Sequence, residues 1–237
     1  IHGFGMFGVR PEPVAKAQPK AQAPKAEASS TTNSGSIFDD AMLAQLNAVF
    51  ARMENPLVLE VHGNGNEVST ELLGYMKALA DLTDKLKVVA GDGTVSDLPC
   101  VRVMRDGKFT GLAFHGVPGG HEFTSFILGL YNASGRGQEL DPAVMAKAQA
   151  LTSEVNFKVL VSLSCTMCPE LVTATQKLAT VNPKVTAEVY DLNHFPDLRE
   201  RYKVMSVPCL VINDEHIAFG RKNLAQLLEM LREKGIA

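Results

Sequence analysis

The sequence predicts an α/β protein made of two tandem copies of one helix and strand unit. Helical and strand-like periodicities alternate along the chain, and the same order of elements recurs after about 100 residues. Short sequence segments recur in the same order: "ELLGYMKALA" (71–80) corresponds to "ELVTATQKLA" (170–179), and "LPCVRV" (98–103) corresponds to "VPCLVI" (207–212). An internal repeat of this length indicates two structural copies, so we expect two units rather than one mixed sheet.

The first copy is predicted to open with a helix. Apolar residues recur at helical spacing over "DDAMLAQLNAVFARM", behind an acidic N-cap candidate, Asp39 or Asp40. The later elements follow from apolar runs separated by turn residues. They are strand 56–62, helix 70–82, strand 85–91, a hairpin over 100–116 that turns at Asp106-Gly107, and a closing helix over 121–131.

The second copy repeats this order. Its predicted elements are helix 142–154, strand 156–164, helix 168–181, strand 185–191, a hairpin over 209–220 that turns at Asn213-Asp214, and a closing helix over 224–235. A strand-helix-strand half requires a right-handed crossover and a parallel pair, and the later hairpin adds antiparallel strands. The combination is typical of a thioredoxin-like fold. We therefore predict two such folds, each a mixed sheet flanked by helices, over residues 37–137 and 138–237.

The first part of the chain has a different composition. Residues 11–36 consist largely of Ala, Pro, Lys and Gln followed by Ser, Thr and Gly, without an aromatic residue. Such a segment cannot bury enough apolar surface to offset the entropy of ordering it. We predict that residues 1–36 form a flexible linker or tail, and a linker implies a further domain on its far side.

Charge and hydrophobicity exclude several classes of partner. The formal net charge is -3, with both signs scattered along the chain, so we expect no nucleic-acid face and no membrane-binding patch. No apolar run approaches the roughly 18 to 20 residues of a membrane helix, and the start lacks the pattern of a signal peptide. Four cysteines in 237 residues are too few for a secreted disulfide scaffold. We therefore expect a cytoplasmic protein.

Two of these cysteines form a close pair in "SLSCTMCPEL". Cys165 falls where a strand ends and a helix begins, so free backbone N–H groups and the helix dipole favour its thiolate. Cys168 falls in the first helical turn, close enough to form a disulfide but partly shielded. Pro169 suits that turn, because the N–H it lacks would have no intrahelical partner. We predict that Cys165 is the attacking nucleophile and Cys168 the resolving thiol.

A zinc site is the alternative interpretation of the pair. Zinc takes about four ligands, and one Cys-x-x-Cys supplies two. The other cysteines, Cys100 and Cys209, each follow a proline at the start of an apolar strand, and the six histidines show no paired spacing. Zinc binding then requires distant residues to converge. We expect Cys100 and Cys209 to be small buried hydrophobic residues without a redox role.

The prolines before those cysteines belong to the same pattern. In thioredoxin-like folds the proline that opens the next strand lies beside the thiols with a cis peptide bond. The missing N–H there leaves the neighbouring backbone free to pair with an extended substrate. We predict cis bonds at Val207-Pro208 and at Leu98-Pro99. A trans proline at a strand start is the alternative.

The two copies are unequal. Aligning them places Ser69 opposite Cys168 and Asn66 opposite Cys165, so the first copy has no thiol at either position. Ser69 precedes Pro99 by 30 residues, whereas Cys168 precedes Pro208 by 40. The first copy is therefore predicted to have a structural or partner-binding role.

Three segments carry a family resemblance over about residues 40–237: "SCTMCPELVTATQKLATVNPKV", "VMSVPCLVIN" and "GVPGGHEFTSFILGL". They resemble the N-terminal domain of the alkyl hydroperoxide reductase flavoprotein subunit, a tandem thioredoxin-fold unit. The resemblance implies electron flow from a thioredoxin-reductase-like flavin module to the disulfide of a peroxiredoxin. It implies Cys165 and Cys168 as the redox pair, Pro208 as the cis proline, and Glu122 as an acidic residue near the thiols.

Glu122 has two interpretations. It is a favourable charge in the first turn of a helix, or it takes up and releases the proton of Cys168. His121 beside it is expected to be a surface or capping residue.

The cofactors are expected to lie outside this chain. "HGNGNEV" (62–68) follows a strand and precedes a helix, but Val68 stands where a phosphate-binding turn has its third glycine. We therefore predict no nucleotide site here and no cofactor besides the Cys165-Cys168 disulfide. FAD and NAD(P)H would belong to a partner reductase, either a separate protein or a domain fused through residues 1–36.

The leading hypothesis is a thiol-disulfide oxidoreductase that relays electrons from a flavoprotein reductase to a peroxiredoxin. A general protein disulfide oxidoreductase is the second hypothesis. The absence of a cysteine pair in the first copy counts against it, because two-fold relatives often carry one in each. The third is a non-catalytic binding module whose cysteines are structural or hold zinc.

Overall fold

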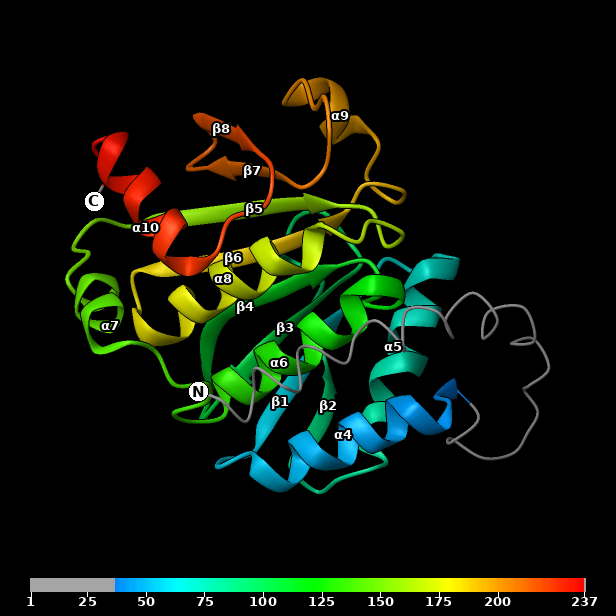
Figure 1. The fold of residues 1–237 in the computed structure, drawn as a ribbon. Helices are drawn as coiled ribbons and strands as arrows, with labels where there is room; N and C mark the ends of the chain where they lie inside the picture. Colours follow the sequence, from blue (N-terminus) through cyan, green and yellow to red (C-terminus); the bar gives the residue numbers. More distant parts are fainter. Residues whose placement is uncertain (1–36, 237) are drawn as a thin grey trace.

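The computed structural model describes residues 37–236, so the predicted linker over residues 1–36 lies outside it. Eight strands form one mixed sheet in the order β2-β1-β3-β4-β6-β5-β7-β8 (Figure 1). The strands are β1 (Leu57–His62), β2 (Leu86–Ala90), β3 (Cys100–Arg105), β4 (Lys108–His115), β5 (Val155–Val161), β6 (Val185–Asp191), β7 (Cys209–Ile212) and β8 (His216–Phe219).

Each half of the sheet has the same internal order, as the repeat predicts. β1 is parallel to β2 and antiparallel to β3, which is antiparallel to β4; β5, β6, β7 and β8 repeat these pairings. The halves are nevertheless joined, because β4 pairs with β6 in parallel. The expectation of two units rather than one mixed sheet was wrong in this respect. Each joining strand would otherwise present an edge of unpaired N–H and C=O groups.

The predicted helices are present in the predicted order, and all but one have bounds within three residues of the predicted ones. They are α4 (Asp40–Arg52), α5 (Glu67–Ala80), α6 (Phe123–Ala133), α7 (Pro142–Gln149), α8 (Cys168–Val181), α9 (Asp197–Arg201) and α10 (Leu224–Glu233), with a 3₁₀ turn η2 (Gly120–Glu122) before α6. Asp39 is the N-cap of α4, and its Oδ1 accepts a hydrogen bond from the N–H of Met42 at 2.8 Å. Helix α7 ends five residues before the predicted 154.

Helix α9 is absent from the sequence prediction. It lies in the segment by which the second copy exceeds the first, between β6 and β7. Leu198 of α9 and the adjacent Tyr202 pack with Tyr190 and Val211 in a small second core. The additional residues of the second copy therefore build a hydrophobic cluster that the first copy lacks.

One hydrophobic core joins both copies. Leu46 and Leu72 from the first copy and Leu178 and Leu227 from the second belong to a single cluster, and each is 0% exposed. Helices α6 and α8 pack together across the front of the sheet in Figure 1, and α8 also packs on β4 of the first copy. The Nζ of Lys177 on α8 donates to the carbonyl of Arg136 at 3.0 Å. The two folds are thus packed as one body.

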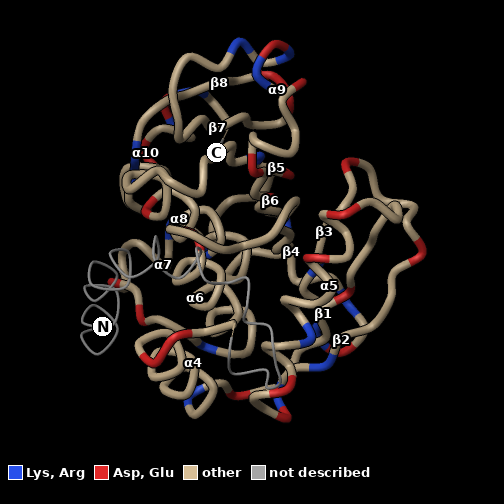
Figure 2. Tube along the Cα trace, turned by 90° about the vertical axis from the view of Figure 1, so that its right-hand side faces the viewer, with Lys and Arg blue, Asp and Glu red and all other residues tan. Residues whose placement is uncertain are grey.

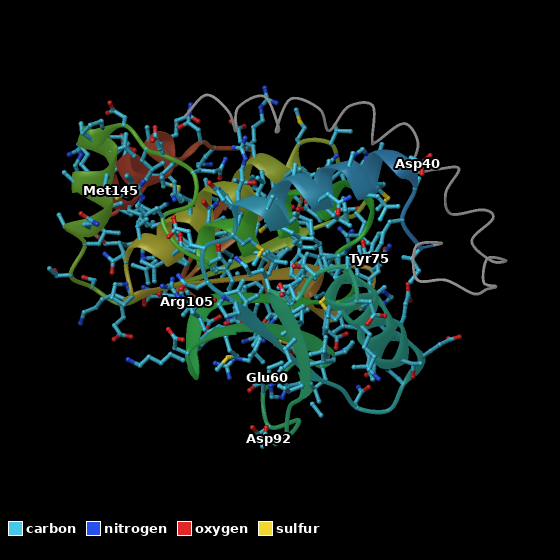
Figure 3. The ribbon with its side chains drawn as sticks, turned by 90° about the horizontal axis from the view of Figure 1, so that it is seen from below. Asp40, Glu60, Tyr75, Asp92, Arg105 and Met145 are labelled. Carbon is cyan, nitrogen blue, oxygen red and sulfur yellow. The ribbon has the colours of Figure 1, made fainter. Side chains whose placement is uncertain are left out.

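The helices lie mainly on one side of the sheet. Figure 3 shows Asp40 on α4 and Met145 on α7 on one side, and Glu60 on β1 and Asp92 on the other. Lys, Arg, Asp and Glu are interspersed along the trace in Figure 2. None of the helices within residues 37–236 is long and apolar enough to cross a membrane.

A buried histidine links the copies at the β4–β6 seam. His115 Nε2 donates to Glu188 at 2.8 Å, its Nδ1 donates to the carbonyl of Asp97 at 2.7 Å, and its ring stacks on Tyr190 at 3.9 Å. Burial alone would lower the pKa of His115, but hydrogen bonds to Cys100 and Glu188 outweigh it and raise this pKa to about 10. The imidazolium therefore forms a charged bridge across the seam.

Candidate functional site

The two thiols lie at the carboxyl end of β5, where the chain turns into α8. Cys168 is the first residue of the helix and is 0% exposed, whereas Cys165 is partly exposed and precedes the helix. Both are free thiols. The N–H of Cys165 donates to the carbonyl of Ser162 at 3.0 Å, which fixes the turn. This placement matches the roles of an accessible nucleophile and a shielded resolving thiol.

Cys168 is held in its protonated form. Burial raises the pKa of this thiol strongly, and a hydrogen bond with Cys165 and the nearby Glu122 carboxyl raise it further. A thiol reacts as its thiolate, so Cys168 cannot attack a sulfur atom until a base removes its proton.

Glu122 is a buried carboxyl group close enough to act on Cys168 electrostatically. It is 0% exposed, its Oε1 accepts a hydrogen bond from Ser125 Oγ, and its Oε2 has no partner within the described chain. Burial raises the pKa of Glu122 to about 8, and the nearby Asp191 contributes in the same direction. A largely neutral carboxyl gains little from a helix dipole, so the burial of Glu122 favours the proton-handling interpretation.

The first copy supplies this carboxyl through the turn η2. The N–H of His121 donates to the carbonyl of Leu163 in the redox loop at 2.8 Å, so His121 binds the loop through its backbone. Gly120 has φ +55°, and a Cβ there would lie 2.6 Å from the Leu163 oxygen. The segment can approach the redox loop this closely only with glycine at that position. The first copy therefore contributes residues to the surroundings of the redox loop.

Pro208 lies at the other side of the redox loop. Both predicted cis bonds, at Val207-Pro208 and Leu98-Pro99, are present. Cys209 pairs with Leu160 across β7 and β5, so the register places Pro208 beside the end of β5, close to where the redox loop begins. Val207 packs against both cores.

The equivalent loop of the first copy is closed by polar side chains. Asn66, at the position of Cys165, accepts a hydrogen bond from the N–H of Ser69 at 2.8 Å. Ser69, at the position of Cys168, donates its hydroxyl to Asn64 Oδ1 at 2.9 Å. These groups satisfy one another, so the loop is held without a thiol.

Sequence reasoning missed Asp191. It is the last residue of β6, which lies between β4 and β5, and its register partner on β5 is Val161. The residue is 1% exposed, and burial raises the pKa of its carboxyl. A polar residue at the carboxyl end of the buried parallel strand "VTAEVYD" was the available signal.

The remaining two cysteines are buried, as predicted, and their lack of a redox role stays a prediction. Cys100 is 1% exposed and Cys209 is 0% exposed. Over residues 37–236, no group of three or more His, Cys, Asp or Glu side chains is placed to hold a metal ion.

Comparison with known proteins gives consistent results. A family model described as a thioredoxin domain matches residues 155–232. Among curated proteins, a Bacillus subtilis protein named NADH dehydrogenase is 32% identical over 192 residues, which cover 81% of this chain and 37% of that protein. The F subunit of the alkyl hydroperoxide reductase of Pseudomonas aeruginosa is also 32% identical, with the same coverages. The chain thus spans a little over a third of the length of these relatives.

Solved structures match over most of their length. The structure of the NTD_N/C domain of the alkyl hydroperoxide reductase AhpF from Enterococcus faecalis is 32% identical, with a TM-score of 0.78, covering 82% of this chain and 99% of that one. A protein disulfide oxidoreductase from Aeropyrum pernix has a TM-score of 0.72 at 21% identity, covering 86% of this chain and 94% of that one, and shares the fold. With its tandem thioredoxin-like folds and its Cys-x-x-Cys pair, the chain belongs to the family of the N-terminal domain of AhpF, among the thioredoxin-like oxidoreductases.

Proposed function

We propose that the chain is the disulfide-exchanging module that passes two electrons from a flavoprotein reductase to the disulfide of a peroxiredoxin. The observation that carries this proposal is the arrangement of a partly exposed Cys165, a buried Cys168 and a buried Glu122 whose Oε2 is unpartnered within the described residues. The family relation to AhpF supports the choice of partners.

The exchange proceeds in two steps. The Cys165 thiolate attacks the partner disulfide, forms a mixed disulfide and releases one partner thiolate. Cys168 then transfers its proton to the Glu122 carboxylate and attacks the Cys165 sulfur, which releases the second partner thiolate. The chain ends as the Cys165-Cys168 disulfide. The partner's two thiolates take up protons from the solvent to give a dithiol, so two electrons have moved. A flavin-bearing reductase returns the chain to its dithiol form.

FAD and NAD(P)H are assigned to that reductase rather than to this chain. The curated relatives, which are much longer than this chain, are named as an alkyl hydroperoxide reductase component and as an NADH dehydrogenase. Such a relay requires a reducing compartment, so we place it in the cytoplasm.

Reconstitution tests the proposal. The chain is mixed with a thioredoxin-reductase-like flavoprotein, NADPH and an oxidised peroxiredoxin, and NADPH consumption is followed. Cys165→Ser is expected to abolish the activity. Cys209→Ala, which alters a buried thiol of the same copy outside the pair, should retain it. Full activity of Cys165→Ser contradicts the mechanism.

Two further measurements separate the rival functions. Equal rates on peroxiredoxin and insulin would favour a general protein disulfide oxidoreductase. For a binding module, metal analysis is combined with thiol titration before and after mild reduction. Two thiols that appear together without release of zinc exclude that function.

A further inference from the structure

The proposed exchange leaves a proton inside the protein. When Cys168 transfers its proton to Glu122, both groups are 0% exposed, so neither can release it directly to water. Glu122 is largely neutral at pH 7, because its pKa is about 8, so it must lose its own proton before it can accept that of Cys168, and it must lose that second proton afterwards. Some group must connect Glu122 to the solvent.

Sheet topology places one further buried carboxyl, that of Asp191, at the same end of the sheet. Glu122 follows β4 and Cys168 follows β5, and β6 lies between these two strands. Asp191 ends β6 opposite Val161, the last residue of β5. On its other side Gly116, with φ +117°, approaches so closely that a Cβ there would lie 3.1 Å from the Asp191 Cβ. The segment that leads to Glu122 therefore runs directly over Asp191.

One partly exposed side chain reaches this buried carboxyl. His194 Nε2 lies 3.8 Å from Asp191 Oδ2, and the histidine side chain is 34% exposed while that of Asp191 is 1% exposed. The N–H of His194 donates to the Asp191 carbonyl at 2.9 Å, and the N–H of Asn193 donates to Asp191 Oδ1 at 3.0 Å. These bonds fix the turn. A separation of 3.8 Å exceeds a direct hydrogen bond, so transfer needs a small rotation of the ring or one bridging water.

We propose that Asp191 and His194 form the proton exit of the redox site, a step that rests on the proposed disulfide exchange. Cys168 gives its proton to the Glu122 carboxylate, Glu122 passes it to the Asp191 carboxylate, and Asp191 passes it to the His194 imidazole. The imidazolium then releases it to water or buffer. One proton leaves for each disulfide closed, and every carboxyl returns to its starting form.

The electrostatics of the cluster agree with this order. Glu122, Asp191 and Cys168 act on one another electrostatically: Asp191 acts on Glu122, and Glu122 acts on Cys168. Cys165 also acts on Cys168, and His194 acts on Asp191. Burial raises the pKa of Asp191 as it does that of Glu122, so each carboxyl holds a proton more readily than it would in water. In this scheme Asp191 and His194 act on the sulfur chemistry through Glu122.

A two-phase assay isolates this step. The reduced protein reacts with an aromatic disulfide reagent that releases a coloured thiolate. The first phase reports attack by Cys165, and the second reports closure by Cys168. His194→Gln is expected to slow the second phase by at least about tenfold and to leave the first phase unchanged. A tenfold effect is a modest part of the rate enhancement that a positioned acid or base contributes. Added imidazole should restore much of the rate in this variant.

Asp191→Asn is the second variant, and it should slow closure without rescue by imidazole. His216→Gln is the matched control, because the side chain of His216 on β8 is 35% exposed and also lies beside a carboxylate, Glu215, at 3.4 Å. Wild-type closure in His194→Gln, or slowing that imidazole does not relieve, overturns the proton exit. Loss of both phases in the wild-type protein would instead overturn the disulfide exchange itself.

Discussion

Replacement of Gly120 by alanine should separate the first copy from the redox loop. The residue has φ +55°, which costs about 1 to 2 kcal/mol for a side chain with a Cβ. The new methyl group would lie 2.6 Å from the Leu163 carbonyl oxygen and 2.9 Å from the Leu163 Cβ. Overpacking of this kind costs roughly 1 to 3 kcal/mol. We expect Gly120→Ala to lower the free energy of unfolding by roughly 2 to 5 kcal/mol.

Substitutions at two other glycines separate the cost of backbone strain from the cost of the contact with Leu163. Gly65 has φ +84°, and a Cβ added there would meet nothing within 4 Å, so Gly65→Ala should show only the backbone strain. Gly74 lies inside α5, also with nothing within 4 Å, and Gly74→Ala should stabilise the protein by about 0.5 to 1 kcal/mol. Urea unfolding measures all three variants.

The same variants should differ in activity. The strain at Gly120 is relieved if η2 moves away, which breaks the bond from the His121 N–H to Leu163 and withdraws Glu122 from Cys168. Closure of the disulfide should then slow in Gly120→Ala and remain normal in Gly65→Ala and Gly74→Ala. Equal stability of Gly120→Ala and Gly65→Ala would refute the reasoning, because the contact with Leu163 would then have no energetic effect.

Two further predictions concern pH. The pKa of His115 is about 10 in the folded protein and about 6.5 in the unfolded chain. Its ion pair with Glu188 therefore stabilises the folded state fully below about pH 6.5, and this stabilisation is lost as the pH rises through about 10. In urea unfolding, His115→Gln should have a much lower free energy of unfolding than the wild-type protein at low pH, and this difference should disappear near pH 10. An equal difference at both pH values would contradict the charged bridge. For Glu122, with a pKa of about 8, closure should accelerate as pH rises through that value. Glu122→Gln should close slowly without this inflection, and an unchanged profile in that variant would exclude Glu122 as the base.

Local patterns predicted the elements that have strong local signals. Helix α8 and strand β6 have the predicted bounds, because Pro169 marks the helix start and "VTAEVYD" begins with apolar and polar residues in alternation. Helix α9 has five residues, which is too short for a helical period to be distinguished. The β4–β6 pairing has no local signal, since it depends on two strand edges that are distant in the sequence.

The residues of the site also differ in how far local sequence patterns predict them. The spacing of Cys165 and Cys168 is itself a signal, whereas Glu122 was indicated by family resemblance and its burial comes from a contact between copies. The position of Asp191 at a strand end was a weak signal in the sequence. Its place between the two loops depends on the sheet order, in which β6 lies between β4 and β5. Residues that act across a repeat boundary are those that a repeat comparison cannot find.

Trapping of the mixed disulfide tests the central claim most directly. The Cys168→Ser protein is reduced, mixed with oxidised peroxiredoxin and analysed by peptide mass spectrometry. Without the resolving thiol, a disulfide between Cys165 and a peroxiredoxin cysteine should accumulate, and Cys165→Ser should form no adduct. An adduct through Cys100 or Cys209, or none with Cys165, would contradict the proposed exchange.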